Sequence, residues 1–430
     1  MTDSLFTIIF AIALTAMVST RLWLARRQIA YVAAHRDRVP SAFAGEIGLP
    51  AHHKAADYTA ARQSLGRIET VIDTLLLLFL TLGGGFAALV IGTAMLPISA
   101  LWQDVAAIAS LVVIGGVASL PFSLYSTFVI EERFGFNRMT LKLFVADLAK
   151  GVALGALLGL PLLYVVLWLM REAGALWWLY AWAAWMAFQL VMLVAYPTLI
   201  APLFNRFQPL PQGEARSRIE ALLARCGFAS SGLFVMDGSR RSGHGNAYFT
   251  GLGRAKRVVF FDTLLSRLKP EEIEAVLAHE LGHFKRRHIA KRIAWSSFLS
   301  LAFLATLAWL VDQPWFYQGL GIPESLVAEA MGRPGVAMGL FFLALPVFTF
   351  ALSPIAASYS RRHEFEADAF AAQAASGSAL VNALVKLYED NASTLTPDPV
   401  HSAFYDSHPP AAIRVARLCA LAGASATGRL

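Results

Sequence analysis

Seven long apolar stretches constrain this chain more than any other feature of its sequence. A helix needs about 20 apolar residues to cross a bilayer, and the stretches that meet or approach this length are residues 5–24, 74–101, 105–130, 151–170, 175–199, 293–311 and 336–358. Hydrophobic residues make up 57% of the 430 residues and charged residues 15%, whereas soluble domains contain about 45–50% and about 25%. The sequence therefore predicts a mainly α polytopic membrane protein with seven transmembrane helices, and it excludes a disordered chain, a coiled coil and an ordinary soluble enzyme.

The distribution of basic residues sets the expected orientation of these helices. Basic side chains gather in the loops after the first and third stretches: Arg26, Arg27, Arg36, Arg38, Lys54, Arg62 and Arg67, then Arg133, Arg138 and Lys142. The loops on the other side carry few bases, and loops rich in Lys and Arg stay in the cytoplasm. We therefore expect the N-terminus outside and the C-terminus in the cytoplasm.

The net charge of +7 follows from these basic loops. In a soluble protein such a charge would suggest nucleic acid, but here we expect membrane lipids and no nucleic acid among the partners. The only cysteines, Cys226 and Cys419, exclude a disulfide framework and a cysteine zinc module. Proline and glycine interrupt several apolar stretches, which fits either ordinary transmembrane usage or helices that bow around an internal cavity.

Two polar segments separate the chain into four parts. We expect helices one to five with their loops in residues 1–205, a cytoplasmic insert in 206–292, helices six and seven in 293–360, and a cytoplasmic C-terminal part in 361–430. In the insert, the pattern predicts a helix at 215–226, strands at 233–236, 247–250 and 257–262, and a helix that begins at Pro270 and continues into the sixth apolar stretch. Because both polar segments face the cytoplasm, we expect them to pack together as one α+β domain.

The helix from Pro270 contains the motif His279-Glu280-Leu281-Gly282-His283. A spacing of four residues brings both imidazoles to one helix face, where they can bind a single Zn²⁺. Glu280 is then placed to take a proton from water that the ion activates. A chance match at an amphipathic helix end is the alternative, but the independently predicted helix and its place at the membrane junction favour zinc catalysis.

A catalytic zinc needs a third protein ligand, and residues 361–368 supply a candidate. Glu364 and Asp368 share one face of a predicted helix, so that Glu364 can complete the metal site and Asp368 can accept a hydrogen bond from a zinc-bound histidine. Glu366 points away and is expected to be solvated. His288 and His363 are alternative ligands by residue type, although neither has the required position on its helix.

The motifs together resemble the integral-membrane CAAX prenyl proteases of type 1, a family of zinc metalloendopeptidases with seven membrane spans. The segments that carry this resemblance cover most of the chain in order: residues 131–140, 202–205, 246–251 and 256–265, the zinc motif, Glu364 with Asp368, and residues 407–410 with Arg414. The combination is far more specific than the zinc motif alone. The family fold encloses a large water-filled chamber with the zinc site at its cytoplasmic end.

The resemblance implies specific roles for residues of this chain. His279, His283 and Glu364 would bind one Zn²⁺ per chain, Glu280 would be the general base and Asp368 would support a ligand from behind. His408 and Arg414 match residues near the scissile carbonyl, where a cationic or hydrogen-donating side chain stabilises an oxyanion. For His408 the alternative is a loop histidine held between prolines.

Four further residues are expected to bind substrate. Asn246 matches a family position at the active site, although a Gly-Asn pair also favours a turn. Val258, Val259 and Phe260 fit an edge strand that can pair with an extended peptide, and their alternative is an ordinary core strand. The expected partner is a peptide or protein substrate that is lipidated or membrane-associated.

The in vivo role leaves alternatives open. Removal of the C-terminal tripeptide of prenylated proteins suits a eukaryotic cell, whereas the Ala- and Arg-rich composition suggests a bacterium and thus the bacterial inner membrane. A quality-control metalloprotease that degrades membrane proteins is one alternative. A metal transporter is a distant one, because a transporter places its ionisable residues near the middle of the membrane, within its spans.

Overall fold

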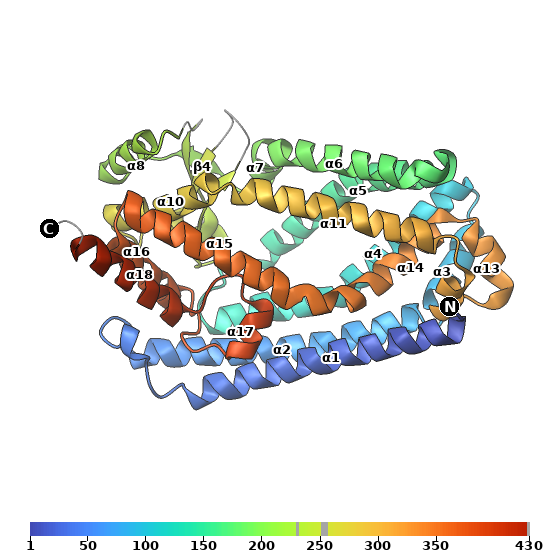
Figure 1. The fold of residues 1–430 in the computed structure, drawn as a ribbon, viewed down its shortest axis with the longest axis horizontal. Coiled ribbons are helices and arrows are strands. Elements are labelled where there is room, and N and C mark those ends of the chain that lie inside the picture. The colour runs from blue at the N-terminus through green and yellow to red at the C-terminus, as the bar shows by residue number, and fades with distance from the viewer. Residues whose placement is uncertain (229–231, 251–256, 428–430) are drawn as a thin grey trace.

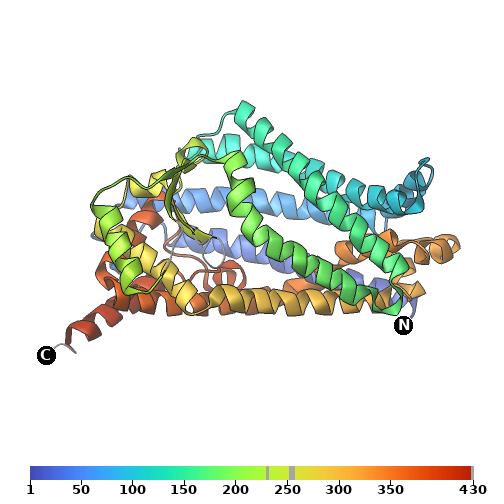
Figure 2. The same ribbon diagram turned by 90° about the horizontal axis from the view of Figure 1, so that it is seen from above.

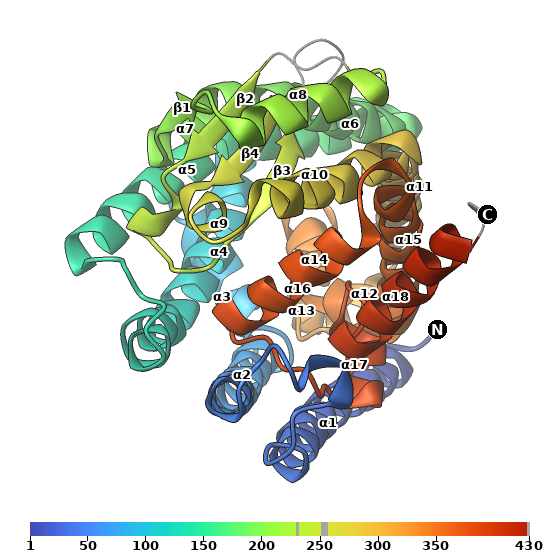
Figure 3. The same cartoon turned by 90° about the vertical axis from the view of Figure 1, so that its left-hand side faces the viewer.

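The computed structural model describes residues 1–228, 232–250 and 257–427. Long helices run along its longest axis, and a small sheet lies with several shorter helices at one end (Figure 1). Turned by 90°, the same bundle shows α5 and α6 running obliquely to the other long helices (Figure 2). The end-on view shows α1, α2, α5, α6 and α11 toward the periphery and α14 nearer the middle (Figure 3).

Helices account for most of the described chain. The helices of the bundle are α1 (Asp3–Ala34), α2 (Leu49–Leu80), α3 (Gly85–Ala94), α4 (Ala100–Tyr125), α5 (Leu141–Glu172), α6 (Trp177–Ala195), α11 (His288–Leu310), α14 (Pro334–Thr349) and α15 (Ser353–Ala374). The other helices are α7 (Ala201–Phe204), α8 (Glu214–Arg225), α9 (Asp262–Leu265), α10 (Pro270–Lys285), α12 (Pro314–Gly319), α13 (Glu324–Met331), α16 (Gly377–Asp390), α17 (Pro399–Tyr405) and α18 (Ala411–Thr427).

Within the described residues, six helical segments are long and apolar enough to cross a membrane, and the number reaches seven if the bent pair α2–α3 is one span. The axes of α2 and α3 differ by 54°. Gly84 at the break has a φ of 72°, a left-handed conformation that glycine adopts without strain. A Cβ on Gly85 would lie 2.8 Å from the ring of Phe79. The predicted stretch 74–101 is therefore not one continuous helix.

The sheet contains four strands in the order β1-β2-β4-β3. They are β1 (Phe207–Pro209), β2 (Leu233–Met236), β3 (Ala247–Thr250) and β4 (Arg257–Phe261). β4 pairs in parallel with β2 and antiparallel with β3. The prediction that Val258, Val259 and Phe260 lie in an edge strand was wrong, because both sides of β4 are hydrogen-bonded and all three side chains are at most 1% exposed. Residues 251–256, between β3 and β4 in sequence, lie outside the described residues.

The molecule contains two large apolar cores, which lie at different places along its length. One lies among the bundle helices and includes Phe10 of α1, Phe86 of α3 and Leu340 of α14. The other lies beneath the sheet, where Leu222 of α8 and Leu277 of α10 pack with residues of the C-terminal segment such as Leu380. The two polar segments therefore share one core, although helices of the bundle separate them in sequence.

The predicted helix from Pro270 does not continue unbroken into the sixth apolar stretch. α10 ends at Lys285 and α11 begins at His288. Between them Arg287 has a φ of 56°, which lies in the left-handed region that a residue with a side chain adopts only at a cost. This break changes the direction of the chain next to the histidine motif.

Candidate metal centre

The start of α10 explains why the histidine motif is held on a regular helix. Pro270 occupies the first turn, where its missing N–H costs nothing. The Glu272 carboxylate accepts a hydrogen bond from the Lys269 amide at 2.8 Å. It also forms an ion pair with Lys386 Nζ at 2.7 Å. Ile273 and Leu277 on this helix are buried in the core beneath the sheet, so the opposite positions are left to face α15.

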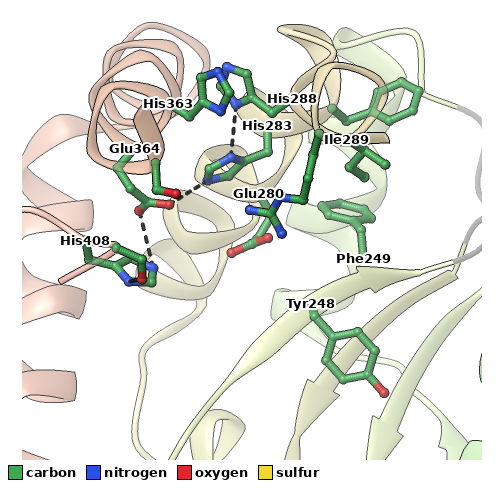
Figure 4. A pocket seen from close by; sticks show the side chains of 13 residues that line it. Tyr248, Phe249, Glu280, His283, His288, Ile289, His363, Glu364 and His408 are labelled. Carbon is green, nitrogen blue, oxygen red and sulfur yellow. Dashed lines mark hydrogen bonds and ion pairs between the residues drawn. The ribbon is translucent and has the colours of Figure 1, made fainter. Parts of the chain in front are cut away.

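Gly282, inside the motif, lets α10 approach α15 closely. A Cβ at this position would lie 2.8 Å from the Cα of Ala367 on α15, which is too close for any other residue without a shift of the backbone. The crossing brings His279 and His283 of α10 to the carboxylate of Glu364, one turn before Ala367. Figure 4 shows Glu364 reaching from α15 toward His283.

His279, His283 and Glu364 form a compact set of metal-binding groups. The two Nε2 atoms lie 3.2 Å apart. Glu364 Oε2 is 3.4 Å from His279 Nε2, and Glu364 Oε1 is 3.3 Å from His283 Nε2. In the described part of the chain these ligand atoms lie within 4.8 Å of one another and form the one such group.

The donor atoms fit a divalent metal ion. Glu364 Oε2 is buried and has no hydrogen-bond partner among the described residues, an arrangement that is costly unless a cation satisfies it. Two imidazoles and one carboxylate are also the protein ligands of one common type of catalytic zinc site, which keeps a fourth position open.

Behind the first histidine lies a buried ion pair. Asp368 Oδ1 is 2.8 Å from His279 Nδ1, and both Asp368 oxygens accept hydrogen bonds of 2.7 Å from Arg414. Burial would lower the pKa of Arg414, but the hydrogen bonds to Asp368 outweigh it and raise the pKa. Arg414 therefore stays charged and holds the Asp368 carboxylate toward His279.

A cavity of about 270 Å³ opens beside these groups. Glu280, His283, Glu364 and His408 line it, together with Tyr248 and Phe249 of β3. Burial raises the pKa of Glu280, so its carboxyl binds a proton more readily than an exposed glutamate does. His408 reaches the cavity from the loop before α18, with its Nε2 atom 3.5 Å from Glu364 Oε2 and its side chain 64% exposed.

Neither Arg414 nor Asn246, both predicted site residues, lines this cavity. Arg414 is buried behind His279, with its Nη2 atom 3.2 Å from His279 Nδ1. Asn246 lies at the start of β3, where its side-chain oxygen accepts a hydrogen bond from the Ala247 amide at 2.8 Å. This is the local bonding that the turn alternative for Asn246 anticipates.

The contacts of two polar groups next to the metal-binding set, His288 and Glu366, were not predicted from the sequence. His288 Nδ1 lies 3.0 Å from His283 Nδ1, and His288 Nε2 lies 3.1 Å from Glu366 Oε2. Glu366, expected to be solvated, therefore has a specific partner, and its side chain is 35% exposed. Helical spacing does not predict this contact, because the chain leaves the helix at Arg287.

Comparisons with known proteins identify the family. Residues 28–206 match the model of the CAAX prenyl protease N-terminal region, described as five membrane helices. Residues 209–422 match peptidase family M48. The chain belongs to peptidase family M48.

Relatives of this M48 peptidase match between two thirds of the chain and nearly all of it. CAAX prenyl protease 1 of Saccharomyces cerevisiae is 31% identical over 424 residues, which are 94% of this chain and 93% of the relative. A homolog from Arabidopsis thaliana is 40% identical over 306 residues, 68% of each chain. The crystal structure of S. mikatae Ste24p has a TM-score of 0.88 and 30% identity and covers 96% of this chain and 99% of its own.

These findings make the chain an integral membrane metalloprotease that resembles the CAAX prenyl proteases. They confirm the family resemblance and the metalloprotease class expected from the sequence. They also favour a protease over the metal transporter, because both halves of the chain match models of one peptidase type.

Proposed function

We propose that this M48 peptidase is a zinc endopeptidase in which His279, His283 and Glu364 hold the metal. The observation that carries the proposal is the meeting of their three ligand atoms within 4.8 Å, beside a cavity that His283, Glu364 and Glu280 line. Zinc bound there would polarise a peptide carbonyl and lower the pKa of water.

Glu280 is the proposed general base. It lies next to the first ligand in sequence, and it faces the same cavity as His283 and Glu364. Burial raises its pKa, so that it holds a proton more readily than an exposed glutamate does, which suits a group that takes a proton from water and later gives it to the leaving amine.

His408 and Arg414 have different proposed roles. His408 lines the cavity, so its ring N–H can donate to the oxyanion that forms as water attacks the carbonyl. Arg414 is held by Asp368 behind His279, and we assign it to the support of the ligand rather than to direct contact with the substrate.

We propose that the substrate peptide binds in an extended form beside β3. This strand is at an edge of the sheet, and Tyr248 and Phe249 from it line the cavity. An edge strand offers free backbone groups to a peptide. The relatives' names, CAAX prenyl protease 1, support a prenylated C-terminal peptide as substrate.

We further propose seven spans, with α2 and α3 forming one broken span, and four segments bounded as the sequence predicts. The N-terminus would lie outside, with the metal site at the cytoplasmic side of a bacterial inner membrane. The basic loops support this orientation. Labelling of single cysteines introduced at residue 2 and in the loop at 36–40, each from one side of the membrane only, would test it.

The decisive experiment measures zinc content and cleavage of a farnesylated CAAX peptide in detergent. For Glu280→Gln we expect about one zinc per chain, as in wild type, with cleavage slower by about 10²–10⁴-fold because the base is lost. Glu271→Gln, an exposed position on the same helix, is the matched control and should cleave normally.

Two other outcomes would contradict parts of this proposal. Equal cleavage by Glu280→Gln and wild type would refute the assignment of the base. Cleavage of an unprenylated, unfolded membrane protein but not of the prenylated peptide would favour the quality-control protease.

A further inference from the structure

The two histidines of the metal centre receive different support from behind. His279 Nδ1 faces the Asp368 carboxylate directly, at 2.8 Å. His283 Nδ1 instead faces a second imidazole, that of His288, at 3.0 Å. The far nitrogen of His288 reaches a carboxylate, Glu366, at 3.1 Å. Both candidate ligands are thus linked to a carboxylate: His279 contacts Asp368 directly, and His283 reaches Glu366 through His288.

One arrangement of protons satisfies this chain of contacts when His283 Nε2 binds a metal. The metal takes the lone pair of Nε2, so the neutral ring carries its proton on Nδ1. That N–H can donate to His288 Nδ1, which leaves the His288 proton on Nε2. The His288 N–H then donates to Glu366 Oε2. Both contacts become hydrogen bonds, and each ring has a fixed tautomer.

Backbone and packing hold His288 in place for this contact. The left-handed residue Arg287, with a φ of 56°, ends α10 and starts α11 so that His288 turns back toward His283. Strained backbone of this kind persists where the surroundings determine it and is common at functional sites. The His288 ring is 4% exposed and stacks on His363, with centroids 3.9 Å apart and planes 9° apart. Figure 4 shows the three rings together.

We propose that His288 and Glu366 form a hydrogen-bonded relay that positions His283 for metal binding by fixing its tautomer and ring orientation. The proposal rests on the metal site proposed above. Both are positioning residues, since they act through His283. Hydrogen-bond partners of this kind raise the affinity of a site for its metal.

Paired variants separate the relay from simple packing. His288→Phe keeps an aromatic ring for the stack on His363 but removes both nitrogens. His288→Gln keeps an acceptor for His283 and a donor for Glu366. Glu366→Ala removes the terminal carboxylate at a half-exposed position. Arg362→Ala is the matched control, because Arg362 is 80% exposed and its Nε atom lies 3.9 Å from Glu366 Oε1, outside the relay.

The measurement is the zinc affinity of the metal-free full-length protein in detergent, by competition with a chromophoric chelator. We expect His288→Phe and Glu366→Ala to bind zinc about 10–100-fold more weakly than wild type. His288→Gln should keep most of the wild-type affinity, and Arg362→Ala all of it. Thermal unfolding of each metal-free variant reports whether it is folded.

The outcomes distinguish the relay from the metal site itself. Wild-type affinity in folded His288→Phe and Glu366→Ala would overturn the relay and leave the metal site intact. If His288→Phe does not fold, Glu366→Ala decides alone. A wild-type protein that binds no zinc, or zinc bound equally by His283→Ala, would overturn the proposed function and the relay together.

Discussion

Two buried arginine–aspartate pairs lie near opposite ends of the molecule. Arg333, just before α14, donates from Nε to Asp104 of α4 at 2.8 Å, and Arg414 of α18 donates from Nε to Asp368 of α15 at 2.7 Å. All four residues are at most 8% exposed. Figure 1 shows α4 and α14 toward the end with the N-terminus and α18 at the other.

The pairs differ in the third group that each aspartate contacts. Asp104 accepts a hydrogen bond from the Gly335 amide at 3.1 Å, and Arg333 also donates a hydrogen bond to the Val90 carbonyl at 3.2 Å. This pair therefore connects separate backbone segments. Asp368 instead contacts the ring of His279. Burial and pairing alone therefore do not indicate a functional site, whereas contact with a histidine that belongs to a group of candidate metal ligands does.

Metal removal should have the largest effect and act on one end only. We expect a strong chelator to abolish peptide cleavage and added zinc to restore it, because the metal supplies the Lewis acid. Hydrogen exchange should become faster in α10 and α15, which the metal links, and stay unchanged around Asp104 and Arg333. Cleavage that survives complete metal removal would contradict the proposal.

Asp368→Asn should have the next largest effect. The amide keeps an acceptor for His279 but removes the carboxylate that pairs directly with the buried Arg414, whose other carboxylate neighbour, Glu364 Oε2, is 3.8 Å away. We expect zinc affinity to fall about 10–100-fold and the free energy of unfolding to fall by about 3–5 kcal/mol. Chelator competition and chemical unfolding in detergent measure the two quantities. Unchanged zinc affinity would mean that Asp368 supports only the fold.

Asp104→Asn is the matched substitution at the other end and should have the smallest effect on the site. The free energy of unfolding should again fall by about 3–5 kcal/mol, since Arg333 loses its buried counter-ion. Zinc affinity and the cleavage rate of the folded protein should equal those of wild type. A loss of zinc affinity as large as that of Asp368→Asn would show that the two ends are coupled. The two arginine–aspartate pairs would then not differ in their effect on the metal site.

Prediction from sequence succeeded where a pattern is local. The spacing of Ile219, Leu222 and Leu223 predicted the helix that is α8, which buries all three. The spacing of His279 with His283, and the position of Glu364 on a second helix, selected the three residues whose ligand atoms meet. These inferences need only the periodicity of a helix and the ligand chemistry of a metal.

Prediction from sequence failed where the position of a residue depends on neighbours that are distant in sequence. The apolar run Val258–Val259–Phe260 is equally compatible with an edge strand and a central one, and only the pairing of β2 and β3 with β4 made it central. The polar pattern around Glu366 indicated a solvated side chain, yet His288 approaches it from another helix, 78 positions away in sequence.

The sequence by itself determined that this chain carries apolar helices long enough for a membrane, a metal-binding histidine pair and a carboxylate to complete it. Those properties reside in composition and in spacings of a few residues. Helical spacing also indicated Asp368 as the support of one histidine, but only the tertiary structure decided which histidine it contacts and that His288 lies against the other. The close crossing of α10 and α15 at Gly282 and the left-handed turn at Arg287 bring Asp368 to one histidine and His288 to the other. Such contacts follow from the packing of whole helices, which no local pattern specifies.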